Sequence, residues 1–408
     1  MEKFNPTLAR LNKDPYPVYR QYRESDPVHL GTPLYPEYPE SWYLFRYDDV
    51  ESLLRNRKFI NDRSKILNGA SCPATTPSRK TFWGLVEKWL LLADPPDHTR
   101  IRSKVSRSFT KQSAEQLITF IQKTADDLLD EVINRGEMDI VRDFAAPLPV
   151  AVIAGFLGLR FSDPVELRAW SRSVANAMAA EATPELYDDA LEKTKYFTSY
   201  LQQAFREKRK QPGDDLLSSL LQVQDDGGLD EDELVSLYSQ IMFAGQETTI
   251  DAIGNSVLAL LQHPEQLEKL QSSPALLPNA VEELFRYNSP IQLAMIRFPT
   301  EDVEIGGKQI RRGDGVTAVL GSANHDQQHF DNAEELDISR IIKSRDVVFG
   351  QGIHRCLGAH LARLELQIVL ETLLRRVKSM QLKSDQLHWR QNVVFRGLTS
   401  LPVSFEAS

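Results

Sequence analysis

One of the two cysteines of this 408-residue chain stands just before a predicted helix, a position that favours a reactive thiolate. Cys356 follows a glycine-rich loop that starts at Phe349, and it precedes a predicted helix from Ala359 to Val377. Free backbone N–H groups at a helix N-terminus stabilise a thiolate, which is the form of cysteine that binds a metal or attacks as a nucleophile. Gly350 and Gly358 carry no side chain, so a bulky flat group could approach the backbone there.

Three kinds of site could use such a cysteine, besides the plain burial that is commonest for a lone thiol. A nucleophilic cysteine needs a histidine base that a third group orients, and His354 stands nearby without a visible orienting partner. A structural zinc site needs further cysteines and histidines at regular spacing, which the sequence lacks. The possibility that remains is a single thiolate facing an open position on a metal.

A second group of reactive side chains interrupts the apolar helix predicted for Glu231 to Gln262. The segment from Ala244 to Thr249 places small residues beside an acid and two threonines. Threonine can hydrogen-bond to the carbonyl one turn earlier, so the helical ladder could loosen there. A polar stripe that simply faces water, made of Gln246, Glu247 and Thr249, would explain the same residues.

Two further pairs of polar residues share helix faces. His98 and Arg102, at i and i+4 after a helix start at Pro95 to Asp97, could both donate hydrogen bonds to an anion. Glu283 and Arg286 lie at i and i+3, where a carboxylate and a guanidinium meet. Taken alone, the first pair indicates an ordinary capped surface helix and the second a solvated surface ion pair.

Taken together, these segments resemble the cytochrome P-450 superfamily. The stretch from Phe349 to Gly358 fits the family's haem-binding pattern Phe-x-x-Gly-x-x-x-Cys-x-Gly, and Glu283 with Arg286 fits its Glu-x-x-Arg pair. The His98 helix, the central threonine helix and an N-terminal Asp-Pro-Tyr occur in the family's order. The match covers nearly the whole chain and is closest to soluble bacterial members that oxidise polyketides, macrolides and fatty acids. Residues 323–326, Ala-Asn-His-Asp, depart from the usual Ala-Asn-Arg-Asp, a difference that does not touch the residues of the reaction.

The resemblance implies a bound haem b with Cys356 as the proximal ligand of its iron. It also implies that four residues bind the haem propionates, namely His98, Arg102, Arg297 and His354. The remaining residues implied for cofactor binding are Phe349, Gly350 and Gly358 in the cysteine loop and Ala244 and Gly245, which leave room for oxygen.

The resemblance assigns catalysis to Glu247 and Thr248, an acid–alcohol pair that delivers the protons needed to cleave the O–O bond of dioxygen. It assigns a structural role to Glu283, Arg286 and Arg340, a charge-paired clamp behind the haem. The implied reaction is monooxygenation, in which one atom of O2 enters a lipophilic small molecule and the other leaves as water.

This reaction needs electrons from a separate protein, which implies a ferredoxin or flavodoxin with an NAD(P)H-dependent reductase. The basic run Arg100, Arg102, Lys104, Arg107 and Lys111 is a candidate docking surface, although a solvated helix face explains it equally well. The substrate we expect is a polyketide or macrolide, and the alternatives are a fatty acid, a terpenoid or a steroid. A peroxide-driven peroxygenase, which would dispense with the acid–alcohol pair, and a non-catalytic haem sensor are the alternative functions.

The elements that position these residues are mostly helical, so we expect a mainly α fold with a small β-rich region and the haem between the central helix and the cysteine-loop helix. Short strands are predicted at residues 42–45 and in a meander from Val303 to Leu320 with a Gly306-Gly307 turn. Residues 61–80 are predicted to be a loop, part of a lid reaching Leu92. The other predicted helices are Ala114–Asn134, Phe144–Leu159, Pro164–Ala180, Pro184–Arg209 and Ala275–Arg286.

Composition narrows the classes of protein further. The net charge of −9 argues against a general nucleic-acid binder. Cys72 and Cys356 are far apart in the sequence, which predicts no disulfide framework and a reducing compartment. No signal peptide is visible, and the longest apolar stretch is broken by Pro147 and Pro149. We therefore expect one domain spanning residues 1–408, a cytoplasmic monomer with no membrane segment, and Cys72 as a bystander in the lid.

Overall fold

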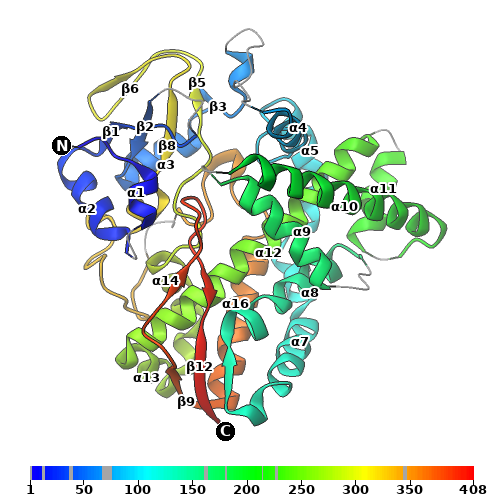
Figure 1. Ribbon diagram of the computed structural model, residues 1–408, viewed down its shortest axis with the longest axis vertical. Coiled ribbons are helices and arrows are strands. Elements are labelled where there is room, and N and C mark those ends of the chain that lie inside the picture. The colour runs from blue at the N-terminus through cyan, green and yellow to red at the C-terminus, as the bar shows by residue number, and fades with distance from the viewer. Residues whose placement is uncertain are drawn as a thin grey trace. The chain divides into compact units, whose positions relative to one another are not determined.

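The computed structural model describes residues 2–11, 14–35, 40–66, 76–159, 164–179, 182–213, 215–225, 228–342 and 347–408 (Figure 1). The chain divides into two compact units. Unit 1 comprises Met1–Ala74, Gly254–Cys356 and Gln386–Thr399, and unit 2 comprises Thr75–Ile253, Leu357–Asp385 and Ser400–Ser408. Within the described residues, no helix combines the length and the hydropathy that a membrane crossing requires.

Unit 1 contains short helices and most of the strands. Strand β2 pairs with β1 in antiparallel and with β8 in parallel orientation, while β3–β5, β6–β7 and β10–β11 form two-stranded ladders. The helices are α1 (Pro6–Leu11), α2 (Tyr16–Ser25), α3 (Tyr47–Arg55), α13 (Pro264–Ser272), α14 (Leu277–Tyr287) and α15 (Leu320–Ala323), with 3-10 turns Arg63–Lys65, Pro274–Leu276 and Gly352–His354. The strands are β1 (Val28–Gly31), β2 (Ser41–Leu44), β3 (Phe59–Ile60), β5 (Phe298–Pro299), β6 (Val303–Ile305), β7 (Lys308–Ile310), β8 (Gly315–Ala318), β10 (His388–Trp389) and β11 (Leu398–Ser400).

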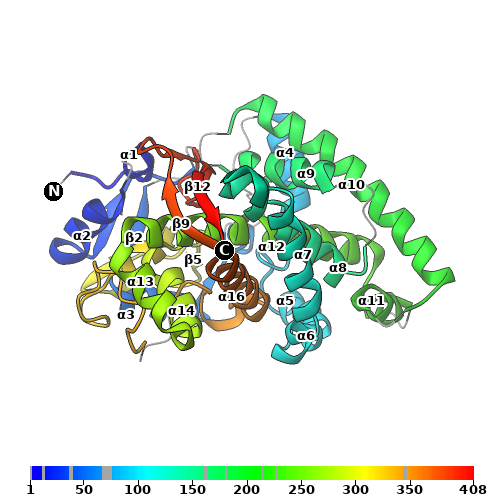
Figure 2. The ribbon, with the colours of Figure 1, turned by 90° about the horizontal axis from the view of Figure 1, so that it is seen from below.

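Unit 2 is built mainly from long helices. Strand β12 lies between β4 and β9 in an antiparallel sheet (Figure 1), and α16 packs against α7 (Figure 2). The helices are α4 (Pro77–Val86), α5 (Asp97–Val105), α6 (Lys111–Glu115), α7 (Ile118–Asp130), α8 (Pro147–Phe156), α9 (Pro164–Ala177), α10 (Pro184–Lys210), α11 (Leu216–Asp225), α12 (Glu231–Gln262, whose last residues belong to unit 1) and α16 (Ala359–Arg376). Shorter elements are 3-10 turns Ser106–Ser108 and Ile133–Arg135, a π-helical turn Ile140–Ala145, and strands β4 (Glu137–Asp139), β9 (Val377–Leu382) and β12 (Pro402–Ala407).

The long predicted helices are confirmed. The central helix α12 has the predicted bounds, Glu231–Gln262, and α10 and α16 agree with the sequence to within one residue at either end. The apolar stretch 144–159 forms the π-helical turn and α8, whose side chains are mostly buried. Apolar runs of this length are recognisable because helical periodicity repeats over several turns.

Three predicted boundaries are wrong. The helix expected at 114–134 breaks into α6 and α7, where the Leu117 N–H bonds to the Ala114 carbonyl three residues back instead of four. The loop expected at 61–80 ends early because α4 begins at Pro77, and the Thr76 hydroxyl caps it by accepting a bond from the Arg79 N–H. The last predicted strand stops at Ala318, since α15 starts two residues later. Cys72 lies outside the described residues.

A buried cluster of charges fixes the interior of unit 1. The Arg286 guanidinium donates to both oxygens of Glu283, at 2.7 and 2.8 Å, and neither side chain is exposed. Arg340 donates from Nε to the same two oxygens, at 3.0 and 3.1 Å. The remaining N–H groups of Arg286 donate to the carbonyls of Asn324, Ala333 and Glu335. A solvated surface pair is thereby excluded for these three side chains.

Removal of the Glu283 carboxylate should therefore lower the stability of the folded protein. In Glu283→Ala, two buried guanidinium groups lose their counter-charge, and we expect the free energy of unfolding to fall by about 3–5 kcal/mol. Urea denaturation followed by circular dichroism measures it. The matched control is Glu24→Ala, which breaks an exposed i,i+4 pair with Arg20 and should change stability little. Equal losses in the two variants would contradict the role assigned to the buried cluster.

Candidate functional site

The loop that carries Cys356 is tightly folded and presents its thiol outward. Cys356 is exposed, although a free cysteine is usually buried, and its N–H donates to the Phe349 carbonyl at 2.8 Å. Gly350 and Gly352 have φ angles of 66° and 71°, a conformation that side chains rarely adopt. A Cβ at Gly352 would also come within 2.4 Å of the Leu54 carbonyl oxygen, so only glycine lets the loop approach α3 so closely.

Hydrogen bonds connect this loop to the buried charge cluster within unit 1. The Asn324 carbonyl accepts from Arg286, and the Asn324 side-chain oxygen accepts from the Val347 N–H at 3.4 Å. The Val347 carbonyl in turn accepts from the Gly350 N–H at 3.0 Å. The position of the cysteine loop therefore depends on residues of α14 that are distant in sequence.

Arg297 and His354 both lie near the C-terminal end of α3. Arg297 is buried and donates to the Leu54 carbonyl at 3.1 Å, the same carbonyl that Gly352 approaches. The Asn61 amide donates to His354 Nε2 at 3.1 Å. A cation and an imidazole thus lie beside the cysteine loop, as anion binding requires. Asn61 was not predicted, and a lone polar residue in a loop carries no signal that would have found it.

The centre of α12 has one open face and one buried face. Ala244 is exposed and Thr248, one turn later, is half-buried, and the Thr248 hydroxyl donates to the Ala244 carbonyl at 2.9 Å. Gln246, Glu247 and Thr249 are all buried, so the water-facing polar stripe considered from the sequence is wrong.

Gly245 has a packing role in the same stretch. A Cβ at Gly245 would lie 2.8 Å from the Ile153 side chain, so glycine lets α12 approach α8 closely. The acid and the hydroxyl of the predicted pair, Glu247 and Thr248, are therefore on a helix held firmly against its neighbour.

His98 and Arg102 lie one turn apart on α5, on one face as predicted. His98 is buried and Arg102 is half-buried. Helix α5 begins at Asp97, directly after the two prolines that signalled its start. An ordinary solvated face does not explain a buried histidine, so a role in binding is retained for this pair.

Each unit, taken by itself, contains residues that are compatible with binding a haem. In unit 1 the exposed thiol of Cys356 stands on a glycine-rich loop with Arg297 and His354 nearby, a donor set suited to iron and to carboxylates. In unit 2 a Cβ built on Gly358 would meet no atom within 4 Å, so a flat group has room against that backbone.

Glu365 is a buried acid that sequence reasoning missed. It lies on the buried stripe of α16 between Leu361 and Ile368, with only 2% of its surface exposed. Burial raises the pKa of its carboxyl well above the usual range, which favours the protonated form. Leu361 stands four residues before Glu365 and Ile368 three residues after it, so all three share one face of the helix. An acid on an apolar helix face is the sequence signal that could have identified it.

Comparison with known proteins extends over the whole chain. The sequence profile of the family described as "Cytochrome P450" matches residues 44–273 and 274–396. "Polyketide biosynthesis cytochrome P450 PksS" of Bacillus subtilis (strain 168) is 37% identical over 415 residues, 99% of each chain. "Vitamin D(3) 25-hydroxylase" of Pseudonocardia autotrophica is 38% identical over 401 residues, 96% of this chain and 94% of that one. The crystal structure of P450BioI in complex with hexadec-9Z-enoic acid ligated acyl carrier protein superposes with a TM-score of 0.89 at 34% identity, covering 98% and 100% of the two chains.

The raised pKa of Glu365 predicts that its replacement changes the stability of the protein in a pH-dependent way. Because its folded-state pKa is raised, the wild-type group must lose a proton on unfolding once the pH exceeds about 4.3, and stability falls as the pH rises above that value. Glu365→Gln removes this loss, so the variant should be more stable than wild type at pH 7 and equal to it near pH 4. Urea denaturation at both pH values measures the difference.

The control for this prediction is Glu371→Gln on the same helix, where the side chain is exposed and the change should have little effect at either pH. A lower stability of Glu365→Gln at pH 7 would mean that the buried carboxyl is ionised and paired, contrary to the assignment.

Proposed function

The chain belongs to the cytochrome P450 family, and on that premise we propose how its own residues carry out the family's reaction. The protein is a monooxygenase with a haem-iron cofactor, and it uses O2, electrons from redox partners and a lipophilic substrate. When bound, the haem supplies the activation of O2, so that one oxygen atom enters the substrate and the other leaves as water. The proposals below concern the roles of individual residues.

We assign the iron ligand to Cys356. The observation that carries this proposal is an exposed thiol on a glycine-rich loop that is tied by hydrogen bonds to a buried charge cluster. The cofactor is haem b, bound without covalent attachment, because no Cys-x-x-Cys-His segment for covalent attachment occurs in the chain. Its propionates would be held by His98, Arg102, Arg297 and His354, which can supply positive charge and N–H donors. Gly350, Gly358 and Ala244 would leave space for the cofactor and oxygen, and Phe349 would pack against the cofactor. The room for oxygen expected at Gly245 is not there, because the position of its missing Cβ is filled by Ile153.

Proton delivery is the role we propose for Thr248 and Glu247. The Thr248 hydroxyl now donates to the Ala244 carbonyl, and rotation about its C–O bond would let it donate to a group above the exposed Ala244 instead. Glu247, the adjacent buried acid, would resupply the proton. The Thr248 hydroxyl and the Glu247 carboxylate are both carried by α12, which packs closely against α8.

The substrate we propose is a neutral polyketide or macrolide. It is supported by the likeness, over the full length of both chains, to a relative named for polyketide biosynthesis. Second candidates are a steroid-like molecule and a fatty acyl chain, which rest on the relative named for vitamin D(3) and on the structure with a fatty-acyl carrier protein. Non-catalytic haem sensing has no supporting observation in the chain.

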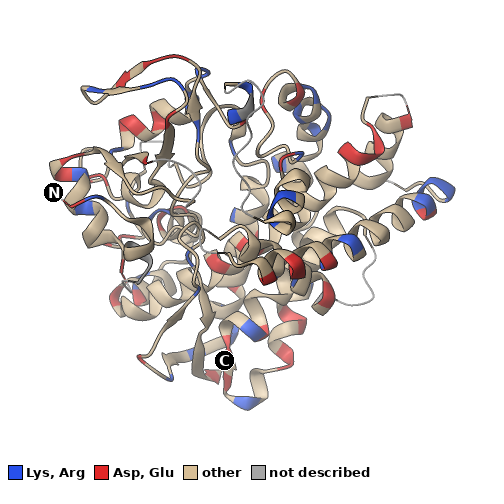
Figure 3. Ribbon diagram, turned by 45° about the horizontal axis from the view of Figure 1, so that its top comes forward, with Lys and Arg blue, Asp and Glu red and all other residues tan. Residues whose placement is uncertain are grey.

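Electrons are proposed to arrive from a ferredoxin or flavodoxin that an NAD(P)H-dependent reductase reduces. Within the predicted docking run, Arg100 is engaged by Glu233 and Lys111 lies 3.6 Å from Glu115, so Lys104 and Arg107 are the better candidates for contact with an acidic partner. Lys and Arg are interspersed with Asp and Glu along the described chain (Figure 3). A single domain, a monomeric state and a cytoplasmic location stay predictions.

The substrate proposal is tested by spectral titration of the haem-loaded enzyme. A macrolide, a long-chain fatty acid and a steroid are each added while the low- to high-spin Soret shift is recorded. We expect the macrolide to bind at least tenfold more tightly than the other two. A shift only with the fatty acid or the steroid would replace the proposed substrate by that class.

The proton-relay proposal is tested with Thr248→Ala on any ligand that shows this shift. We expect the fraction of NAD(P)H electrons recovered as product to fall about tenfold or more, with hydrogen peroxide formed in its place, while haem binding is unchanged. Thr249→Ala is the matched control, because Thr249 makes the equivalent bond to the Gly245 carbonyl but is buried.

The relay would be contradicted if Thr248→Ala recovered the same fraction of NAD(P)H electrons as product as wild type does. It would also be contradicted if this fraction fell equally in Thr248→Ala and Thr249→Ala. Product formed with hydrogen peroxide but never with a reductase system would indicate a peroxygenase.

A further inference from the structure

His325 is a buried histidine of unit 1 that has no role in the proposed reaction. It lies two residues after helix α15, and only 2% of its surface is exposed. Its ring stacks on Tyr16 of α2, with the ring centroids 4.2 Å apart and 24° between the planes. Ring nitrogen Nε2 lies 2.9 Å from the carbonyl oxygen of Tyr287, the last residue of α14. The ring is therefore held in one orientation between two helices.

Each ring nitrogen of His325 faces a hydrogen-bond acceptor. Nε2 faces the Tyr287 carbonyl oxygen, and Nδ1 lies 3.3 Å from Oε2 of Glu334. A neutral imidazole carries one N–H, whereas an imidazolium carries two. The bond at Nε2 uses the single N–H of a neutral ring, which leaves a lone pair on Nδ1 facing the carboxylate. Nδ1 accordingly makes no hydrogen bond to the residues that the structure describes.

Glu334 is a carboxylate whose charge is held by a second partner. The buried Arg23 donates from Nη2 to Oε1 of Glu334 at 2.8 Å, and from Nη1 to the carbonyl and the hydroxyl of Ser322, both at 3.1 Å. Although burial opposes it, His325 and Arg23 lower the pKa of the Glu334 carboxyl below its usual value. One oxygen of Glu334 is thus paired with Arg23, and the other is the one that faces Nδ1.

Charged and titratable groups surround the ring on each element that packs against it. They are Tyr16 and, through Glu334, Arg23 from α2, Arg286 and Tyr287 from α14, and Asp326 and Glu334 from the chain after α15. The hydroxyls of Tyr16 and Tyr287 stay neutral, because burial raises the pKa of both. Asp326 accepts the Tyr47 N–H at 2.9 Å, so its charge is used at the start of α3. Glu334 and Arg286 are therefore the charges that act on the ring.

The surroundings of His325 disfavour a charged ring at neutral pH. Burial lowers the pKa of the ring below its usual value, and the Arg286 guanidinium acts in the same direction. The Glu334 carboxylate and the Tyr287 carbonyl act in the opposite direction, which keeps the proton within reach. The ring is therefore uncharged at pH 7 and gains a proton in weakly acid solution.

The two side chains stand beside the backbone that satisfies Arg286. The carbonyl of Asn324, directly before His325, accepts from the Arg286 guanidinium, and so do the carbonyls of the residues on either side of Glu334. A bond between His325 and Glu334 therefore joins the two stretches of chain that surround this buried guanidinium. The charge of a single ring bears on the cluster that fixes the interior of unit 1.

We propose that His325 and Glu334 form a proton-dependent hydrogen bond within unit 1, a pH-sensitive contact built into the fold. In neutral solution the ring is uncharged and binds only the Tyr287 carbonyl. In weakly acid solution a proton from solvent adds to Nδ1, and the new N–H donates to Oε2 of Glu334 as a charge-assisted bond. The gain of this proton is the only covalent change. Because it concerns folding rather than turnover, this proposal does not rest on the residue roles assigned above.

The burial of the ring sets the direction of the effect on stability. Since the pKa of His325 in the folded protein is below that of an exposed histidine, about 6.5, the unfolded chain binds the proton more tightly. The stability that the neutral ring contributes is present above about pH 6.5 and is lost as the pH falls from there to the folded-state pKa.

Nuclear magnetic resonance of the haem-loaded full chain, as its ferrous carbon monoxide complex with 15N-labelled histidine, follows the ring protons directly. The His325 signals are assigned by their absence in His325→Gln. We expect a proton on Nε2 alone at pH 7.5 and protons on both nitrogens in weakly acid solution, with a midpoint below pH 6.5. Glu334→Gln removes the carboxylate that receives the new N–H and should lower this midpoint by about one pH unit or more.

Urea denaturation of the same proteins at pH 7.5 and pH 5.5 measures the effect on folding. Over this interval the folding equilibrium constant should fall about three- to tenfold more in wild type than in His325→Gln. The matched control is His388→Gln, which replaces an exposed histidine on β10 of the same unit and should keep the wild-type pH dependence. Circular dichroism and the Soret band check that all variants are folded and haem-loaded.

Protons on both nitrogens already at pH 7.5, or a proton on Nδ1 alone, would overturn the proposal. The same midpoint in wild type and Glu334→Gln would also overturn it, because the carboxylate would then not receive the new N–H. Equal pH dependence of stability in wild type and His325→Gln would overturn the link between this contact and folding.

Discussion

The most demanding interaction in unit 1 is the burial of two guanidinium groups against one carboxylate. Charged groups are stable out of water only when their hydrogen bonds are satisfied, and here Glu283 serves both Arg286 and Arg340 while backbone carbonyls take the remaining N–H groups. Those carbonyls belong to residues 324–335, so the electrostatic requirement fixes the path of a segment with little regular structure. From Asn324 the hydrogen bonds continue through Val347 to the loop that presents Cys356. The loop that carries Cys356 is thus tied by hydrogen bonds to a buried charge cluster.

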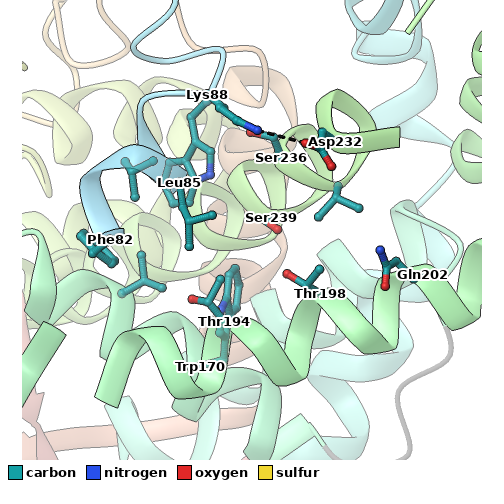
Figure 4. A pocket seen from close by; sticks show the side chains of 14 residues that line it. Phe82, Leu85, Lys88, Trp170, Thr194, Thr198, Gln202, Asp232, Ser236 and Ser239 are labelled. Atoms are coloured by element: carbon teal, nitrogen blue, oxygen red, sulfur yellow. Dashed lines mark hydrogen bonds and ion pairs between the residues drawn. The ribbon is translucent and has the colours of Figure 1, made fainter. Parts of the chain in front are cut away.

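Helix α12 is buried along most of its length, although polar residues occur in most of its turns. The turn from Ala244 to Thr248 offers a hydroxyl next to open space, while Ser236 and Ser239 face a pocket two to three turns earlier (Figure 4). Half a helical turn separates the directions of Ser239 and Thr248.

Sequence patterns predicted what depends on local periodicity and missed what depends on tertiary contacts. The bounds of α12 and α16 followed from long runs of apolar residues, and the family resemblance located Cys356, Glu283 and Arg286. The start of α4 was missed because Thr76 and Pro77, a sound capping pair, stood in a stretch rich in loop residues. The burial of Gln246 could not be predicted, since nothing in a short polar segment says which side of a helix its neighbours cover. The buried acid Glu365 was missed although the apolar helix positions around it carry a signal.

The central claim is that Cys356 supplies the thiolate to the haem iron. It is tested most directly by the absorption spectrum of the ferrous carbon monoxide complex of the haem-loaded full chain. We expect wild type and Cys72→Ser to show the red-shifted Soret band of a thiolate ligand, and Cys356→Ser to bind haem but lack that band. A thiolate-type band that persists in Cys356→Ser, or that is lost in Cys72→Ser instead, would contradict the account.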